Sequence, residues 1–297
     1  MVGKFYKLVF IFFTVHAMMS GILHGQEKSE IDSEKNNSSY DKLEPKEFRK
    51  LIRTKKFNKP TNGCCSGYVQ CNLIVLNKEY ADNFRQFCEK NTKSCPLLEV
   101  CEEGSPYPRK LAAMADLRTD LPKYTIYHYG KKQEDVEDVK GHWPKDSVAF
   151  LIGCSFSYDS ALKEAGIKLR SAASGTNVPM YISNIPCNPV GKLQGNMVVS
   201  MKPIKIKDVP LEEEITSRFK FAHGAPIHVG DPSQIGIEDL GQPEWGDPVE
   251  VFSDEVPVFH ACGVTPQLIL MLAKIPFVIS HAPGHMFVTD TLCTALI

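Results

Sequence analysis

The sequence predicts an α/β fold, a mixed sheet with flanking helices, or a mixed α+β variant of it. The chain would form either one unit or two subdomains around a cleft. Three observations predict this class. Apolar runs of strand length recur along the chain, helical patterns follow several of them, and Gly, Pro or capping residues separate the two kinds of segment.

The expected strands are short apolar segments. Residues 68–76 (YVQCNLIVL) form the longest of them, and their apolar and β-branched side chains predict a buried strand. The other segments with strand character are 96–100, 124–129, 147–152, 196–201, 256–261 and 276–280.

The expected helices begin at capping or first-turn residues. One helical pattern follows Asn77 and another follows Cys154. A third begins at Pro210, and a fourth has Thr265 as its cap with a proline next to it. Residues 256–280 thus predict a strand–helix–strand unit, which would be parallel and right-handed.

Composition limits the class of protein. The chain has 297 residues, a formal net charge of −1 and 43% hydrophobic residues, which are ordinary values for a globular protein. The near-neutral charge gives no electrostatic basis for a nucleic-acid partner. The ten cysteines are an even number but too dilute for a small disulfide scaffold.

The N-terminal part differs from the rest. Residues 1–26 have two lysines followed by an apolar run, which favours a secretory signal peptide, with mitochondrial import or an uncleaved anchor as alternatives. Residues 27–45 are polar and predict a disordered linker. Residues 46–297 are expected to form the globular domain, without stable insertion into a membrane.

Several reactive side chains directly follow predicted strands. Cys154, Cys262 and the pair His281 and His285 have this position, and ligands of α/β sheets gather at such strand ends. We therefore expect three strand ends to converge on one pocket. The helix after Cys154 is expected to lower the pKa of its thiol and make it a nucleophile or polarised donor. The alternative is a buried cysteine that only fills space.

Two loops rich in Gly and Pro each carry a pair of histidines. His223 and His228 occur in AHGAPIHVGDP, where Asp231 follows, and His281 and His285 occur in SHAPGHMFVTD. These side chains suit acid/base catalysis because histidine titrates near neutral pH, and Asp231 would orient one imidazole. Two alternatives remain open: a structural role in turns and, with lower probability, a bound divalent metal ion. No other cofactor is expected.

The remaining candidate residues would bind a small substrate. Arg118 and Arg218 are candidate carboxylate binders because a guanidinium group binds carboxylate with two hydrogen bonds. Each is individually more often part of a surface ion pair. Asn184 is a candidate amide donor or a turn residue, and Cys262 would line the substrate site.

The chain resembles the D-glutamate cyclase family, also described as hydro-lyases, from about residue 48 to residue 290. The resemblance is carried by segments in the same order, among them GYVQCNLIVL, ADLRTDLPKY, AFLIGCSFSYDSALKEAG, HGAPIHVGDP, VPVFHACGVTPQ and HAPGHMFVTD. It implies reversible dehydration of D-glutamate to 5-oxo-D-proline without an established organic cofactor. It also implies a mitochondrial location as the alternative to secretion.

The sequence leaves two other hypotheses for the function open. One is a hydrolase of a small lactam or amide that depends on cysteine or a metal ion. The other is a non-enzymatic secreted binding protein with disulfide bonds. If the protein is a cyclase, the histidines are expected to act as acid and base. Cys154 and the helix amides after it would stabilise the oxyanion. A covalent thioester on Cys154 is a further alternative. The expected partner is a small molecule, and a homo-oligomer is compatible with the sequence.

Overall fold

The computed structural model describes residues 39–171 and 176–297. The predicted signal or targeting segment and residues 27–38 of the predicted linker lie outside the described residues. Within these two ranges the packed part of the chain begins before residue 46, because the ring of Tyr40 lies 5.1 Å from that of Phe57. None of the described helices has the length and apolar character needed to cross a membrane.

The larger sheet has seven strands in the order β2–β5–β1–β10–β3–β4, with β11 also paired to β1. All of its paired strands are antiparallel. The strands are β1 (Tyr68–Asn77), β2 (Leu97–Val100), β3 (Tyr124–His128), β4 (Lys131–Val136), β5 (Ser147–Gly153), β10 (Phe277–His281) and β11 (Phe287–Leu292).

The central strand β1 explains the longest apolar run in the sequence. Eight of its ten residues in succession are buried. Leu73 and Val75 pack into one hydrophobic cluster, whereas Ile74 and Leu76 pack into another. Because alternate side chains point to opposite faces of a sheet, a strand covered on both faces is apolar at every position.

The smaller sheet has four strands in the order β6–β7–β9–β8, again all antiparallel. They are β6 (Met180–Pro186), β7 (Asn196–Lys205), β8 (His228–Val229) and β9 (Glu255–Ala261). Met180, Ser200 and His260 are cross-strand neighbours and so share one face of this sheet. That face contributes to the pocket described below.

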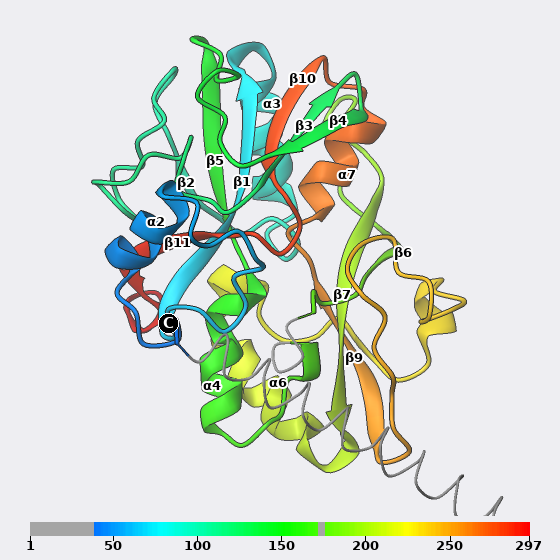
Figure 1. Cartoon of the computed structure of the whole chain (residues 1–297). Coiled ribbons are helices and arrows are strands. Elements are labelled where there is room, and N and C mark those ends of the chain that lie inside the picture. The colour runs from blue at the N-terminus through cyan, green and yellow to red at the C-terminus, as the bar shows by residue number, and fades with distance from the viewer. Residues whose placement is uncertain (1–38, 172–175) are drawn as a thin grey trace, which may run out of the picture.

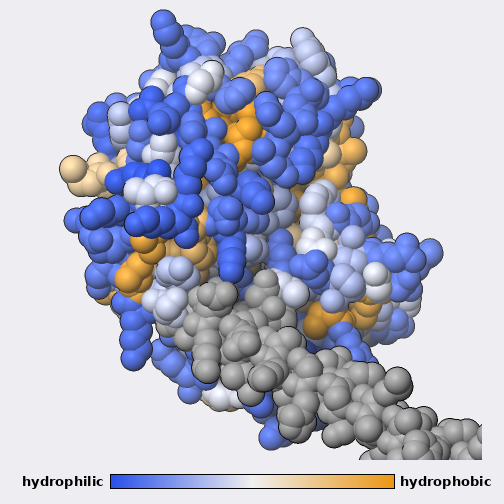
Figure 2. Space-filling model, viewed as in Figure 1, coloured by the Kyte–Doolittle hydropathy of each residue, from blue (hydrophilic) through white to orange (hydrophobic). Residues whose placement is uncertain are grey.

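The α-helices lie around the two sheets (Figure 1). They are α2 (Pro45–Arg53), α3 (Lys78–Lys90), α4 (Asp159–Glu164), α6 (Val209–Ser217) and α7 (Thr265–Leu272). Together the elements form a mixed α+β fold, the second of the two expected fold classes. Their strands lie in two separate sheets. The face of the molecule in Figure 2 is mainly hydrophilic, and its apolar residues appear in separate small patches.

One expected supersecondary unit is wrong. The segment β9–α7–β10 was expected to form a parallel, right-handed unit within one sheet, but β9 belongs to the smaller sheet and β10 to the larger one. The chain therefore crosses from one sheet to the other through α7. This crossing matters for the site, because it brings the start of α7 to the seam between the sheets.

Candidate active site

The ends of β5, β9 and β10 meet at one pocket between the two sheets. Its empty volume is about 330 Å³, including solvent at its mouth. Cys154, Cys262 and His281 share this pocket, as their positions after strands predicted, and His223 joins them. The other lining residues are Asn72, Ser155, Phe156, Val178, Met180, Ser200, Gly263, Val264, Gly284 and Met286.

Cys154 lies between β5 and the short 3₁₀ helix η1 (Ser155–Tyr158), as its N-cap residue, and is only 7% exposed. Burial raises the pKa of the Cys154 thiol well above its ordinary value, and the opposing hydrogen bond from the Phe156 amide is weaker. This corrects the expectation of a lowered pKa. The penalty for burying a thiolate exceeds the effect of one helix turn, so the thiol is protonated at neutral pH.

Cys262 occupies the equivalent position between β9 and α7. Burial raises the pKa of its thiol to about 11, against the smaller effect of the Val264 amide, which donates to its sulfur. The next residue, Gly263, lies against β1: a Cβ there would be 2.0 Å from Nδ2 of Asn72. Only glycine therefore lets this turn approach the larger sheet so closely.

His223 enters the pocket from the loop between α6 and β8. Its backbone has a φ of +78°, a left-handed conformation that is uncommon for a residue with a Cβ. Nδ1 donates to the Lys93 carbonyl oxygen at 2.9 Å, because a carbonyl oxygen can only accept. Burial lowers the pKa of His223 to about 4, so the imidazole is neutral at pH 7 and its Nε2 can accept a proton.

His281 is the last residue of β10 and is completely buried. Its Nδ1 lies 3.3 Å from the Leu73 amide nitrogen, and the side-chain amide of Gln267, on α7, lies 3.2 Å from the same atom. Burial lowers the pKa of His281 to about 4. The pocket therefore contains two imidazoles that are both neutral at physiological pH.

The second member of each histidine pair does not line the pocket. His285 is buried, with Nδ1 donating to the Pro283 carbonyl oxygen at 3.0 Å, and burial lowers its pKa. His228 is half-buried, and its Nε2 donates to the backbone carbonyl of Asp231 at 2.7 Å. The carboxylate of Asp231 instead accepts from the Ser233 amide. The contacts of these three residues fit a structural role in turns, which was the alternative interpretation.

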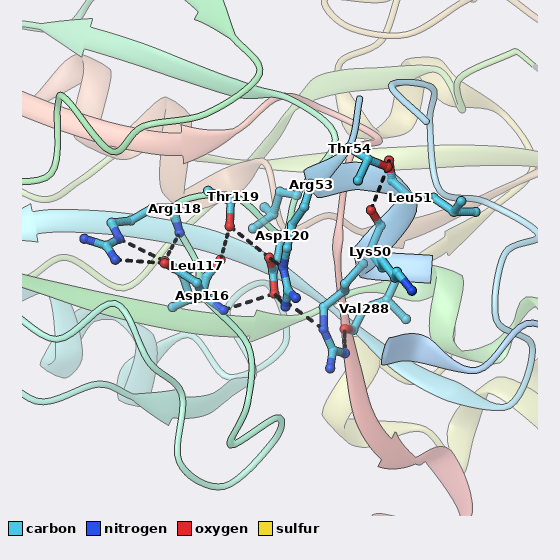
Figure 3. A network of polar contacts seen from close by, with 12 residues as sticks. Lys50, Leu51, Arg53, Thr54, Asp116, Leu117, Arg118, Thr119, Asp120 and Val288 are labelled. Atoms are coloured by element: carbon cyan, nitrogen blue, oxygen red, sulfur yellow. Dashed lines mark hydrogen bonds and ion pairs between the residues drawn. The ribbon is translucent and has the colours of Figure 1, made fainter. Parts of the chain in front are cut away.

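Arg118, expected to bind a carboxylate of the substrate, does not line this pocket. Its guanidinium group lies 2.8 Å from Asp116 and 5.7 Å from the centre of the Tyr107 ring. Figure 3 shows Arg118 in a polar network with Asp116, which continues through Asp120 to Arg53 on α2. The network joins the 116–120 loop to the N-terminal helix.

Two further expected substrate residues also lie elsewhere. Arg218 is exposed at the C-terminal end of α6, and Asn184 is exposed on β6. Neither lines the pocket. Sequence reasoning selected arginines because their charge suits a carboxylate, but it had no information on which of them face the strand ends.

The sequence analysis missed Asn72 and Ser200, which line the pocket from β1 and β7. Asn72 Nδ2 donates to the Gly153 carbonyl oxygen at 2.7 Å and so ties β1 to the end of β5. A polar residue inside each buried strand was the available signal: Asn72 interrupts YVQCNLIVL, and Ser200 interrupts the apolar run 197–201.

Behind the pocket lies a completely buried pair, His260 on β9 and Glu212 on α6. His260 Nε2 is 2.8 Å from Glu212 Oε1, and His260 Nδ1 is 3.2 Å from the Gly224 carbonyl oxygen. The pair thus supports the backbone next to His223. Sequence analysis did not select either residue, because a single buried His or Glu has no distinguishing local pattern.

The polar side chains that line the pocket carry no formal charge at neutral pH. They are Asn72, Cys154, Ser155, Ser200, His223, Cys262 and His281. In the described part of the chain no group of three or more His, Cys, Asp or Glu residues is arranged to hold a metal ion. All ten cysteines are free thiols, which contradicts the disulfide-bonded binding protein.

Comparison with known proteins gives a consistent result. Residues 148–290 match the family model for D-glutamate cyclase. A protein of Bacillus subtilis and one of Stutzerimonas stutzeri, both named "Putative hydro-lyase", are 52% and 50% identical to this chain over 84% and 86% of its length and 96% of theirs. A Geobacillus kaustophilus protein of the same name is 51% identical over 84% of this chain and 94% of its own.

Among solved structures, a nitrogen repressor-like protein from Methanococcus jannaschii covers 84% of this chain and 99% of its own, with 12% identity and a TM-score of 0.36. A score this low supports no conclusion. The sequence relatives, in contrast, define the class: the protein is an enzyme, a hydro-lyase. The chain belongs to the D-glutamate cyclase family.

Proposed function

We propose that this hydro-lyase catalyses the reversible dehydration of D-glutamate to 5-oxo-D-proline in the pocket between the two sheets. The observation that carries the proposal is the convergence of Cys154, Cys262, His223 and His281 on one small hollow. Acid, base and hydrogen-bond donors are the groups that ring closure requires, and these four side chains can supply them.

The reaction needs a base first, because the amine of glutamate attacks only as the neutral form. We assign this role to His223, because it lines the pocket and its pKa of about 4 keeps the imidazole unprotonated at neutral pH, with Nδ1 held by the Lys93 carbonyl oxygen. The amine nitrogen then forms a bond to the side-chain carboxyl carbon and loses a second proton. The bond from that carbon to one oxygen breaks, and this oxygen leaves as water after it has gained two protons, which equal in number those that the nitrogen lost.

The oxyanion that forms during attack needs donors. We assign this role to the Cys154 thiol and the amide of Ser155, the first residue of η1, because the first amide of a helix has no partner within the helix. A protonated thiol can donate a hydrogen bond to the oxyanion. The raised pKa of Cys154 favours this role over a covalent thioester.

His281 and Cys262 complete the assignment. His281 is a second neutral imidazole, held by Leu73 and Gln267, and is placed as the group that exchanges protons with the leaving oxygen. Cys262 faces the substrate from the start of α7. An apolar wall that includes Phe156, Met180 and Met286 suits the methylene groups of a five-carbon substrate.

The deciding experiment is chiral analysis of the products after incubation with D-glutamate and, separately, with L-glutamate. We expect 5-oxo-D-proline from the D-isomer, and D-glutamate from 5-oxo-D-proline in the reverse direction. Formation of neither compound by a folded protein would contradict the proposal. A hydrolase of other small lactams would instead open rings that lack the carboxylate.

A further inference from the structure

Ser200 is a buried polar residue of the pocket with no part in the proposed mechanism. Ser200, on β7, is 1% exposed, and its Oγ has no hydrogen-bond partner among the described residues. A buried hydroxyl without a partner is destabilising, and such groups are rare in native proteins unless they serve another purpose. Ser200 lines the pocket, so the group that can satisfy this hydroxyl is a ligand in the pocket.

The N-terminal end of α7 lies beside Ser200. Thr265, the first residue of α7, accepts from the Val198 amide at 3.0 Å and donates to the Cys262 carbonyl oxygen at 2.7 Å. Val198 precedes Ser200 by two residues on the same face of β7, a separation of roughly 7 Å along the strand. The start of α7, at Gly263 and Val264, lines the same pocket.

The chemistry of this corner suits an anion. The N-terminal end of a helix carries partial positive charge, which favours a negative group. In α7 the Thr265 amide already donates to the Cys262 carbonyl oxygen and Pro266 has no N–H, so the Ser200 hydroxyl is the donor at this corner. The nearby cation Lys202 is already engaged, because its Nζ lies 2.8 Å from Asp159. No Asp or Glu lines the pocket to repel a negative group.

We propose that Ser200 Oγ, beside the positive N-terminal end of α7, forms the subsite for the carboxylate of the substrate that does not react. The inference rests on the proposed function for the identity of the substrate. The subsite takes the carboxylate-binding role that the sequence analysis gave to Arg118 and Arg218, which do not line the pocket. The subsite requires a small ligand with a carboxylate group. Ser200 binds this group and does not act as an acid or a base.

The test is calorimetric titration of the full chain and of Ser200→Ala with glutarate, a five-carbon dicarboxylate without an amine, and with 5-oxo-D-proline. Loss of a hydrogen bond to a charged group is expected to weaken binding of both by about 10- to 100-fold. Pyrrolidin-2-one, which has the lactam ring without the carboxylate, is expected to bind both proteins equally and weakly.

A matched control separates binding from folding. Ser183, on β6, is also buried, but its Oγ donates to the Met197 carbonyl oxygen at 2.7 Å, and it does not line the pocket. Ser183→Ala is expected to keep ligand affinity and to lower the melting temperature by roughly 2 to 4 °C. Ser200→Ala is expected to keep or raise the melting temperature, because the hydroxyl that it removes has no partner.

Equal affinity of the wild-type protein and Ser200→Ala for glutarate and 5-oxo-D-proline would overturn the inference, as would a wild-type protein that binds neither. Binding that depends on Ser200 in a protein that does not convert D-glutamate would support the subsite and reject the proposed reaction. Conversion of D-glutamate with unchanged KM in Ser200→Ala would support the reaction and reject the subsite.

Discussion

His260 and Glu212 form a hydrogen-bonded pair that is completely buried. His260 Nε2 lies 2.8 Å from Glu212 Oε1, and His260 Nδ1 lies 3.2 Å from the Gly224 carbonyl oxygen. Each polar atom of the imidazole therefore has a partner, as burial of a polar ring requires.

The first prediction concerns this pair. Glu212→Ala leaves a buried imidazole nitrogen without its partner and is expected to lower the free energy of unfolding by about 1 to 3 kcal/mol. Glu212→Gln keeps a hydrogen-bonding group beside the imidazole and is expected to cost less. Urea unfolding of the two variants measures the difference. Equal losses in both would contradict a stabilising hydrogen bond between the two side chains.

The second prediction separates the histidines. His223→Asn is expected to lower kcat by at least about 100-fold, because it removes the proposed base from the pocket. His228→Asn is the matched control from the same loop: its ring contacts the Asp231 carbonyl outside the pocket, so kcat is expected to stay unchanged. Steady-state kinetics of 5-oxoproline formation measures both. Similar losses in the two variants would mean that the loop acts as a structural unit only.

The third prediction concerns the state of Cys154. Because burial raises the pKa of its thiol, alkylation of the native protein by iodoacetamide at pH 7 is expected to be slow at this residue. Cys154→Ser, which keeps a donor, is expected to retain more activity than Cys154→Ala. Mass spectrometry of the alkylated protein and kinetics of the two variants provide the measurements. Rapid alkylation at neutral pH would restore the thioester alternative.

The fourth prediction concerns the arginines outside the pocket. Arg218→Ala is expected to change kcat/KM by less than about twofold, because an exposed residue away from the site has little effect. Arg118→Met removes the ion pair with Asp116 without removing a group from the pocket, and is likewise expected to keep KM. A rise in KM of tenfold or more (about 1.4 kcal/mol) in either variant would show that the substituted arginine contributes to substrate binding.

The fifth prediction concerns pH. In the folded protein His223 and His281 have a pKa of about 4, whereas an unfolded histidine titrates near 6.5. Between these values the unfolded state binds more protons, so stability is expected to fall as the pH is lowered from about 6.5 to about 4. Above this window the two histidines contribute no pH dependence.

Chemical unfolding of the wild-type protein and of His281→Asn at several pH values isolates this contribution, because acidic groups affect both proteins alike. The wild-type protein is expected to lose up to roughly 3 kcal/mol more than the variant across the window. Parallel stability curves would contradict the lowered pKa of His281.

Local sequence patterns determined the elements and the strand ends. The run 68–76 is apolar at nearly every position because β1 is covered on both faces, and this is visible in the sequence. Cys154, Cys262 and His281 were found because a side chain that directly follows a strand is placed at a sheet edge by the backbone alone.

Only the tertiary structure decided which edges meet. Partner choice between strands depends on contacts far apart in the chain, so the sequence could not place β9 and β10 in different sheets. Arg118 was assigned to substrate by its charge, whereas its actual partner, Asp116, is two residues away. Depth of burial, a property of the whole fold, also decided the direction of the Cys154 pKa against the local helix, and left Ser200 without a partner inside the pocket.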